Sequence, residues 1–303
     1  MQNLANPERD PSDPVSVVSI HDGVASICID NPPINAINSA VRARLWHVLD
    51  AIENDPLIEA VVIGASGRMF SGGGDLRELG QPDPPGSPNL GALALRIERL
   101  AKPVVAMLFG KVIGGGVLLA MACHARVGMA DAQLALPEVN LGFVPGAGGT
   151  QRLPRLVGLN AAVEMVSLAA PLTAADALAK GLLDAVADTK NQLAAMAADT
   201  ARAIARGGRP WRRTFELQVP GGALAADLLS SLREGAARKF PDREAVHVAI
   251  DLLCLAAGTP FDQGAQEERA AYLRLASSPQ TRQLLDAFFA ERAAARKHKE
   301  TAA

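Results

Sequence analysis

Short apolar segments alternate with helix-like segments between residue 15 and about residue 160, and this alternation constrains the fold most. Runs such as "IEAVVIGAS" and "KPVVAMLFG" have the length of buried strands. Residues 39–54 instead carry apolar side chains at helical spacing, with Ser39 as the predicted N-cap. The stretch "VSVVSIHDGVASICID" places two β-branched runs around a turn, which predicts a hairpin. Together these segments predict an α/β domain with buried strands.

The strand signal fades after about residue 160, and the rest of the sequence is predicted to be helical. The composition changes at "ARGGRPWRR" (205–213), which we interpret as a solvated hinge. The first residues are polar and rich in proline. We therefore expect three parts, namely a flexible arm over 1–14, an α/β core over 15–204 and a helical C-terminal extension over 205–303.

Composition excludes several classes of protein. Apolar residues make up 49% of the 303 residues and aromatic residues only 4%, so the core must consist mainly of Ala, Val, Leu and Ile. The net charge of −2 gives no general attraction to nucleic acid. No apolar run reaches the roughly 18 residues of a membrane helix, and the N-terminus does not resemble a signal peptide. We expect a cytoplasmic protein with no nucleic-acid or membrane partner.

The three cysteines, Cys28, Cys123 and Cys254, lie far apart in the sequence. Their odd number and wide spacing match neither a disulfide framework nor a zinc-ligand pattern. Free cysteine usually packs as a small hydrophobic residue, so we expect each one to be buried. The sequence predicts no metal site.

Two glycine loops, "FSGGGD" (70–75) and "IGGGV" (113–117), each follow a predicted strand and open a predicted helix. The first N–H groups of a helix have no partner within it, and the helix dipole adds partial positive charge there. Two such loops could aim two N–H donors at one oxygen and stabilise an oxyanion or enolate. Phosphate binding is less favoured because neither loop matches GxxxxGK[ST] or GxGxxG. Tight turns and close helix packing are the structural alternative.

The wider pattern resembles a known family. The segments "FSGGGDLREL", "KPVVAMLFGKVIGGGVLLAMACHARV" and "ALPEVNLGFVPGAGGTQRLPRLVG" resemble, in order and spacing, signature segments of the crotonase (enoyl-CoA hydratase/isomerase) superfamily. The likeness is strong over roughly residues 15–190. The insert "QPDPPGSP" and the helical tail are similar to the amino-terminal part of bifunctional hydratase/3-hydroxyacyl-CoA dehydrogenases. Because the sequence has no GxGxxG, we expect no dehydrogenase part.

The resemblance implies an α/β fold, a crotonase-like ββα spiral with a C-terminal all-helical extension. It implies an acyl-CoA thioester as substrate and no separate cofactor, since coenzyme A is part of that substrate. It also implies a homo-oligomer, a trimer or a multiple of one. By position, the resemblance makes the backbone N–H groups of Gly74 and Gly115 the oxyanion donors and Glu138 the acid/base. Further substrate or CoA positions implied in this way are Ala36, Ser71, Gly72, Gly73 and Asp75.

One catalytic position of the hydratases is changed in this sequence. The hydratases use two glutamates twenty residues apart; the second matches Glu138, but the first falls on Leu118. Leucine can neither activate water nor transfer a proton. A single acid can still move a proton from the α-carbon to the γ-carbon, so the sequence favours double-bond isomerisation over hydration. A hydratase with rerouted water activation, or a degenerate CoA-thioester-binding protein, remains an alternative.

Other polar residues near these motifs have structural interpretations. Asp75 is expected to accept hydrogen bonds at a helix start, and His124 to be a buried structural residue. The segment "GAGGTQR" is expected to shape the acyl pocket or a subunit contact, although it could also be a third anion-binding helix start. Three arginines are candidates for contacts with CoA phosphates, and the sequence does not rank them: Arg42, Arg44 and Arg77.

Overall fold

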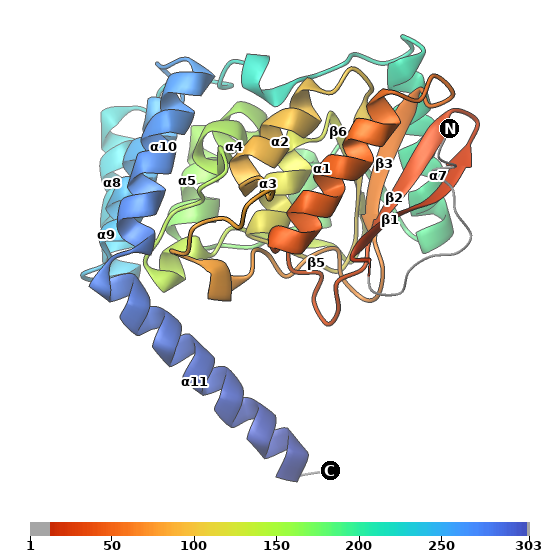
Figure 1. Ribbon diagram of the computed structural model, residues 1–303. Helices are drawn as coiled ribbons and strands as arrows, with labels where there is room; N and C mark the ends of the chain where they lie inside the picture. The colour runs from red at the N-terminus through yellow and green to blue at the C-terminus, as the bar shows by residue number, and fades with distance from the viewer. Residues whose placement is uncertain (1–12, 302–303) are drawn as a thin grey trace.

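The structure is a computed structural model that describes residues 13–301. The predicted arm over 1–14 therefore lies almost entirely outside the described residues. Within them, strands and helices alternate up to α7, and helices follow from there to the end (Figure 1). No helix of residues 13–301 combines the length and the apolar character needed to cross a membrane.

A six-stranded sheet forms the centre of the fold. Its order is β1 (Val15–His21), β2 (Val24–Ile29), β3 (Ala60–Ala65), β4 (Val104–Leu108), β6 (Ala125–Met129) and β9 (Ala185–Ala187). The antiparallel pairing of β1 with β2 confirms the predicted hairpin, and the remaining neighbours are parallel. A smaller sheet contains β5 (Lys111–Ile113), β7 (Gln133–Ala135) and β8 (Leu172–Thr173).

The expectation of helices alone after residue 160 is wrong, because β8 and β9 lie beyond it. These strands have only two and three residues. A segment of two or three residues is too short to show a recognisable alternation of apolar and polar side chains. Strand β8 pairs with β7, and strand β9 pairs with β6. Both strands depend on these pairings with residues that are distant in the sequence.

Eleven α-helices and three 3₁₀ turns surround the sheets in the described part of the chain. The helices are α1 (Ser39–Glu53), α2 (Leu90–Arg99), α3 (Gly115–Ala122), α4 (Gly149–Val157), α5 (Leu159–Ser167), α6 (Ala174–Ala179), α7 (Lys190–Ala205), α8 (Ala226–Lys239), α9 (Glu244–Leu255), α10 (Phe261–Ala276) and α11 (Pro279–Thr301). The turns are η1 (Leu76–Glu78), η2 (Glu138–Leu141) and η3 (Thr214–Glu216).

The predicted cap of α1 is displaced by one residue. The Asn38 side chain accepts a hydrogen bond from Val41 N–H at 3.0 Å and is the N-cap. The Ser39 hydroxyl instead donates to Glu78 at 2.7 Å. Asparagine and serine are comparable N-caps, so local sequence does not decide which of the two residues caps α1. The hydrogen bond between Ser39 and Glu78, which forms only in the folded chain, leaves Asn38 as the cap.

The central strands of the large sheet are buried on both faces. Side chains of β3 alternate between two cores: Val61 and Ile63 face the larger core, and Ala60 and Val62 face the smaller one. Helix α7 covers the smaller core, whereas α1, α2 and α3 contribute to the larger one. Parallel strands with helices on both faces are expected to be continuously apolar, as β3 is.

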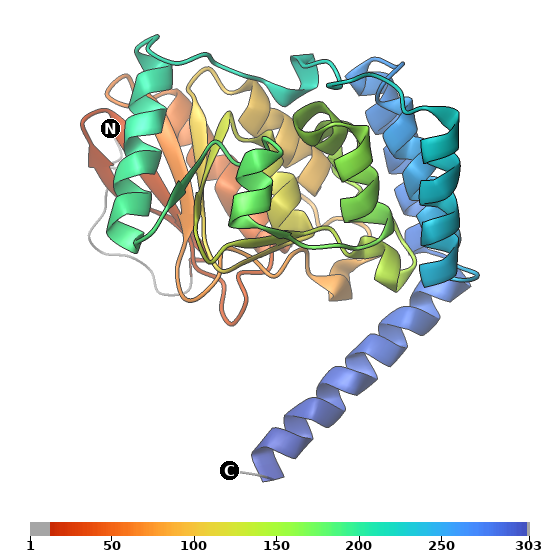
Figure 2. The ribbon, with the colours of Figure 1, turned by 180° about the vertical axis from the view of Figure 1, so that it is seen from behind.

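Helices α8, α9 and α10 form a layer beside α4 and α5, at the end of the molecule opposite to α7 (Figures 1 and 2). Helix α11 leaves this layer and projects away from the body. The linker at 205–213 is exposed or half-buried along its whole length, as expected of a solvated segment. It is also tied to the sheet, because the Asp184 side chain, which is 5% exposed, forms ion pairs with Arg126, Arg209 and Arg212. The domain boundaries themselves stay a prediction.

Candidate active site

The two glycine loops meet at one end of α3. A Cβ on Gly115 would lie 2.9 Å from the backbone nitrogen of Gly74, so the loops can approach this closely only because residue 115 is glycine. Gly114 has φ +47° and ψ −117°, a conformation that side chains disfavour, and α3 begins there without a side-chain cap. Among residues 13–301, no protein group accepts a hydrogen bond from the N–H of Gly74 or of Gly115. Both N–H groups are therefore available to a ligand oxygen.

The first glycine loop opens a 3₁₀ turn of three residues and not the helix that we expected. Asp75 caps this turn by accepting a hydrogen bond from Arg77 N–H at 3.0 Å, which confirms its predicted role at a helix start. The hydrogen bond from the Arg77 guanidinium also lowers the pKa of Asp75. The turn ends at Leu79, which is extended, and Gly80 follows with φ +74°. The proline-rich segment after it cannot continue a helix.

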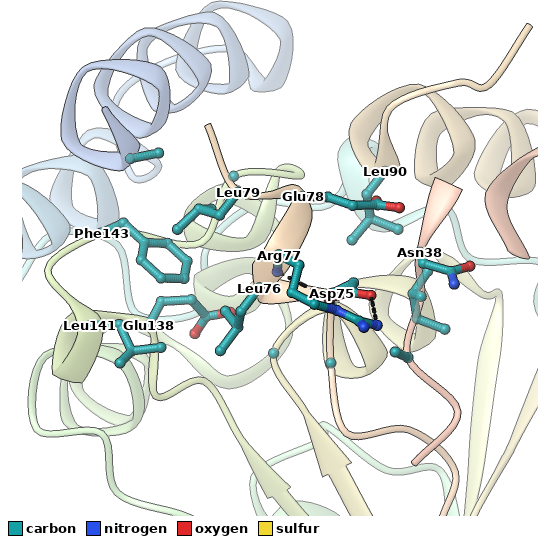
Figure 3. A pocket seen from close by; sticks show the side chains of 18 of the residues that line it. Asn38, Asp75, Leu76, Arg77, Glu78, Leu79, Leu90, Glu138, Leu141 and Phe143 are labelled. Carbon is teal, nitrogen blue, oxygen red and sulfur yellow. Dashed lines mark hydrogen bonds and ion pairs between the residues drawn. The ribbon is translucent and has the colours of Figure 1, made fainter. Parts of the chain in front are cut away.

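Glu138 lies on η2 and is 7% exposed. Its Oε1 lies 3.1 Å from the position that a Cβ on Gly114 would occupy, and its Oε2 has no hydrogen-bond partner within the described residues. Figure 3 shows its side chain beside Leu141 and Leu76. Burial raises the pKa of this carboxyl to about 8, with a smaller contribution from the charge of Glu268. A buried carboxyl with a raised pKa at the start of α3 is typical of a proton-transferring group.

Leu118 occupies the next turn of α3 and is 4% exposed. It lines the same cavity as Glu138. Its side chain packs against Gly149, where a Cβ would overlap with it. The leucine is thus a packed core residue, as predicted, and it fills the space that a second acid would need.

The cavity between the loops has a volume of about 930 Å³. Of the predicted substrate positions, Ala36, Gly72, Gly73 and Asp75 line it. Ser71 is buried outside the lining: its hydroxyl donates to the Asn35 carbonyl at 2.7 Å and accepts from Gly73 N–H at 3.1 Å. Ser71 therefore supports the loop and does not face the cavity.

The residues of the apolar wall of this cavity were not predicted from the sequence. Part of the wall comes from η1 and η2 and the residues directly after them: Leu76, Leu79, Leu141 and Phe143 (Figure 3). Side chains of α10 and α11 complete the wall: Tyr272, Leu273, Ala276, Phe288 and Phe289. The only signal in the sequence is the apolar spacing of these helices, which does not tell where they pack.

The three arginines that were candidates for CoA phosphate contacts all form ion pairs with acidic residues. Arg42 is buried and bonded to Glu78 at 3.0 Å and to Asp83 at 2.8 Å, so its charge is already matched. Arg44 pairs with Asp13, and Arg77 with Asp75. Arg42 and Arg77 line the cavity, as do two arginines that sequence reasoning missed, Arg269 and Arg292.

His124 has the buried structural role that we expected. Its Nδ1 accepts a hydrogen bond from Val104 N–H at 2.9 Å, and its Nε2 contacts the Glu98 carbonyl at 3.1 Å. Burial lowers its pKa to about 4, so the ring is neutral at pH 7. Of the three cysteines, Cys123 is buried as expected, whereas Cys28 and Cys254 are half-buried. Within residues 13–301, no group of acidic, histidine and cysteine side chains is arranged to hold a metal ion.

The repeated strand and helix units, the paired glycine loops and the buried glutamate define an α/β protein of the crotonase type. The chain belongs to the enoyl-CoA hydratase/isomerase family, whose model matches residues 19–220. It is similar to the peroxisomal bifunctional enzymes of Danio rerio (38% identity over 280 residues, 89% of this chain) and Homo sapiens (35% over 278 residues, 91%). It spans 37% and 38% of the length of these two relatives.

A probable enoyl-CoA hydratase of Bacillus subtilis (strain 168) is 42% identical over 165 residues, which cover 53% of this chain and 64% of that protein. Solved structures share the fold of this chain. An enoyl-CoA hydratase from Mycobacterium avium subsp. paratuberculosis K-10 has a TM-score of 0.64 at 26% identity, and covers 92% of this chain and 96% of its own. An enoyl-CoA hydratase/isomerase from Pseudoalteromonas atlantica T6c has a TM-score of 0.68 at 22% identity over 92% and 97% of the two chains, and shows the shared fold.

Proposed function

We propose that this enzyme isomerises 3-enoyl-CoA thioesters to 2-enoyl-CoA thioesters, with Glu138 as the single acid/base. The observation that carries the proposal is the combination of one buried carboxyl at Glu138, whose Oε2 has no hydrogen-bond partner within the described residues, with a packed leucine at residue 118. The names of its relatives, among them a glyoxysomal fatty acid beta-oxidation multifunctional protein of Cucumis sativus, favour fatty acyl substrates.

In this mechanism the thioester oxygen accepts hydrogen bonds from the N–H groups of Gly74 and Gly115. Their position supports this role, since Gly115 opens α3, Gly74 lies beside it, and neither N–H has a protein acceptor within residues 13–301. The helix dipole favours negative charge at this point. The Glu138 carboxylate takes a proton from the α-carbon, and the electrons move into a dienolate whose charge rests on the thioester oxygen. The same carboxyl then returns the proton to the γ-carbon, which leaves the double bond at the 2-position.

The reaction needs Glu138 ionised, and its raised pKa predicts the pH dependence. At a pKa of about 8, only about one tenth of the free enzyme carries the carboxylate at pH 7. We therefore expect kcat/KM for a 3-enoyl-CoA to rise with pH and to level off above a midpoint near 8. The measurement is kcat/KM from pH 6 to pH 9.5. A flat profile, or one with a midpoint near the ordinary glutamate value, would contradict the assignment of Glu138 as base.

A panel of CoA thioesters tests the proposed function directly. We expect turnover of 3-enoyl-CoA and slow hydration of 2-enoyl-CoA. Fast hydration of 2-enoyl-CoA would instead support a hydratase that activates water by another route. Binding of both thioesters without turnover of either would show a degenerate CoA-thioester-binding protein.

Leu118→Glu places a carboxyl where the hydratases of the resembled family have one. We expect a higher rate of crotonyl-CoA hydration than in the wild type, because two carboxyls can divide water activation and α-carbon protonation. The variant should also be less stable, by about 1–3 kcal/mol, because a carboxyl replaces a buried apolar side chain. Leu118→Gln is the matched control, since it adds a polar group of the same length that cannot activate water. Equal hydration rates in both variants would contradict the prediction.

A further inference from the structure

The helices α10 and α11 contact the segment 138–150, which carries Glu138, at three separated points. Thr281 on α11 donates a hydrogen bond from Oγ1 to the Gly142 carbonyl at 2.9 Å. The Tyr272 ring on α10 covers Gly146, where a Cβ would overlap with it. The third contact comes from Glu268, also on α10. The helical extension therefore supports the half of the site that holds the acid.

Glu268 makes the strongest of these contacts. Its side chain is fully buried and accepts three hydrogen bonds at the start of α4: from Gly148 N–H at 2.5 Å, from Thr150 N–H at 2.7 Å and from Thr150 Oγ1 at 2.7 Å. A carboxylate is the strongest acceptor that a protein can place at a helix N-terminus, where free N–H groups and the dipole both favour it. Glu268 lies more than a hundred positions after the residues that it binds, so no local sequence pattern predicts these contacts.

The residues that Glu268 holds belong to the cavity wall. Gly146 and Ala147 line the cavity directly before Gly148, and Gly149 is the surface on which Leu118 packs. Arg152, one turn into α4, donates to the Ala147 carbonyl at 2.7 Å and so ties the same loop to the helix. A displacement of the start of α4 would thus move the wall that faces Glu138 and leave a gap beside Leu118.

We propose that Glu268 is a positioning residue for the acid Glu138: from α10 it fixes the start of α4, and with it the cavity wall that faces Glu138. The Glu268 carboxylate also makes a smaller electrostatic contribution, which raises the pKa of Glu138. The effect of Glu268 on catalysis rests on the proposed function, whereas its contacts with α4 are independent of that function. Burial raises the pKa of Glu268 to about 7, against the three donors that lower it. The charged and titratable groups around the two carboxyls include Arg152 on α4, its partner Glu98 on α2, and Tyr272 on α10. Arg42, Asp83 and Arg269 line the cavity together with Glu138.

The test compares Glu268→Gln, Glu268→Asp and Glu267→Gln. Glutamine keeps the size of the side chain, but it turns an N–H₂ group toward one of the donors and removes the charge. We expect kcat to fall by about 10- to 100-fold with little change in KM, because a small misplacement of a catalytic group costs that much. The midpoint of the pH profile should also move down, since the charge of Glu268 raises the pKa of Glu138. Glu268→Asp should lose kcat but keep the midpoint.

Glu267→Gln is the matched control, because it removes the same charge from the adjacent, exposed position of α10 and should behave as the wild type. The proposal is overturned if Glu268→Gln matches this control in kcat and in pH midpoint, or if it loses activity with an unchanged midpoint. If Glu268→Gln does not fold, Thr150→Val removes one donor and keeps the Glu268 carboxyl. A lower kcat then supports the proposal, and a wild-type kcat overturns it.

The failure of the proposed function has a different signature. If the wild type turns over no 3-enoyl-CoA but hydrates 2-enoyl-CoA, the isomerase proposal fails, and the same variants are compared in the hydration assay. If it turns over neither, the readout is hydrogen exchange of the backbone amides in residues 138–150. Faster exchange in Glu268→Gln than in Glu267→Gln supports the positioning role, and equal exchange overturns it.

Discussion

Glu138→Gln is expected to lower the turnover of a 3-enoyl-CoA by at least about 10²–10⁴-fold, the usual contribution of general acid–base catalysis. Glutamine has the same shape and fills the same buried position, but it cannot accept the α-proton. Because one carboxyl both removes and returns the proton in the proposed mechanism, the substitution abolishes both half-reactions together.

Within residues 13–301, no other carboxyl of the cavity is free to take over. Besides Glu138, the carboxylates that line it are Asp75, Glu78 and Asp83. Asp75 is bonded to Arg77, whereas Glu78 and Asp83 are bonded to Arg42. The hydrogen bond from Arg77 lowers the pKa of Asp75, and, although burial opposes them, hydrogen bonds from Ser39 and Arg42 lower the pKa of Glu78, so both are weak bases. The Asp83 carboxylate is held by the Arg42 guanidinium at 2.8 Å. The loss of activity in Glu138→Gln should therefore be nearly complete.

Binding measurements separate this loss from a loss of structure. Glu138→Gln should bind the CoA thioester about as tightly as the wild type, because the N–H groups of Gly74 and Gly115 are unchanged. Glu267→Gln, which removes an exposed carboxyl, serves as the control for charge. A Glu138→Gln variant that keeps more than a tenth of wild-type turnover would show that another group carries the proton.

Glu98→Gln is expected to lower the free energy of unfolding by about 3–5 kcal/mol, the largest effect on stability that we expect from a single substitution. Glu98 on α2 is 1% exposed and binds the Arg152 guanidinium on α4 at 2.7 and 3.0 Å. It also accepts a hydrogen bond from Phe215 N–H at 2.9 Å. Without its charge, the guanidinium of Arg152 remains buried and unpaired, and an unpaired buried charge is far more costly than a broken surface pair.

Urea unfolding of the variant tests this expectation against Glu244→Gln. Glu244 pairs with Arg274 on the surface, where both side chains are more than half exposed, so its loss should cost less than about 1 kcal/mol. The double variant Glu98→Leu/Arg152→Met should regain part of the stability, because it removes both members of the buried pair. Equal losses in Glu98→Gln and Glu244→Gln would show that the buried pair contributes no more than a surface pair.

Local sequence was sufficient for most of the core. The hairpin of β1 and β2 follows from two β-branched runs around a turn, and α1 follows from its apolar spacing. The glycines at 114 and 115 predicted a close approach of backbone and ligand, and the structure places them beside Gly74 and Glu138. Leu118 could be interpreted from the sequence because it lies in a motif in which the resembled hydratases have a glutamate at that position.

The tertiary structure alone decided which distant residues complete the site. Periodicity shows that α10 and α11 have an apolar face, but it does not show that Tyr272 covers Gly146 or that Glu268 binds the start of α4. The cap of α1 at Asn38 and the strand β9 likewise depend on partners far along the chain. The raised pKa of Glu138 also depends on burial by several elements at once. A sequence pattern reports the conformational preference of neighbouring residues, whereas desolvation and side-chain pairing arise only when separate elements pack together.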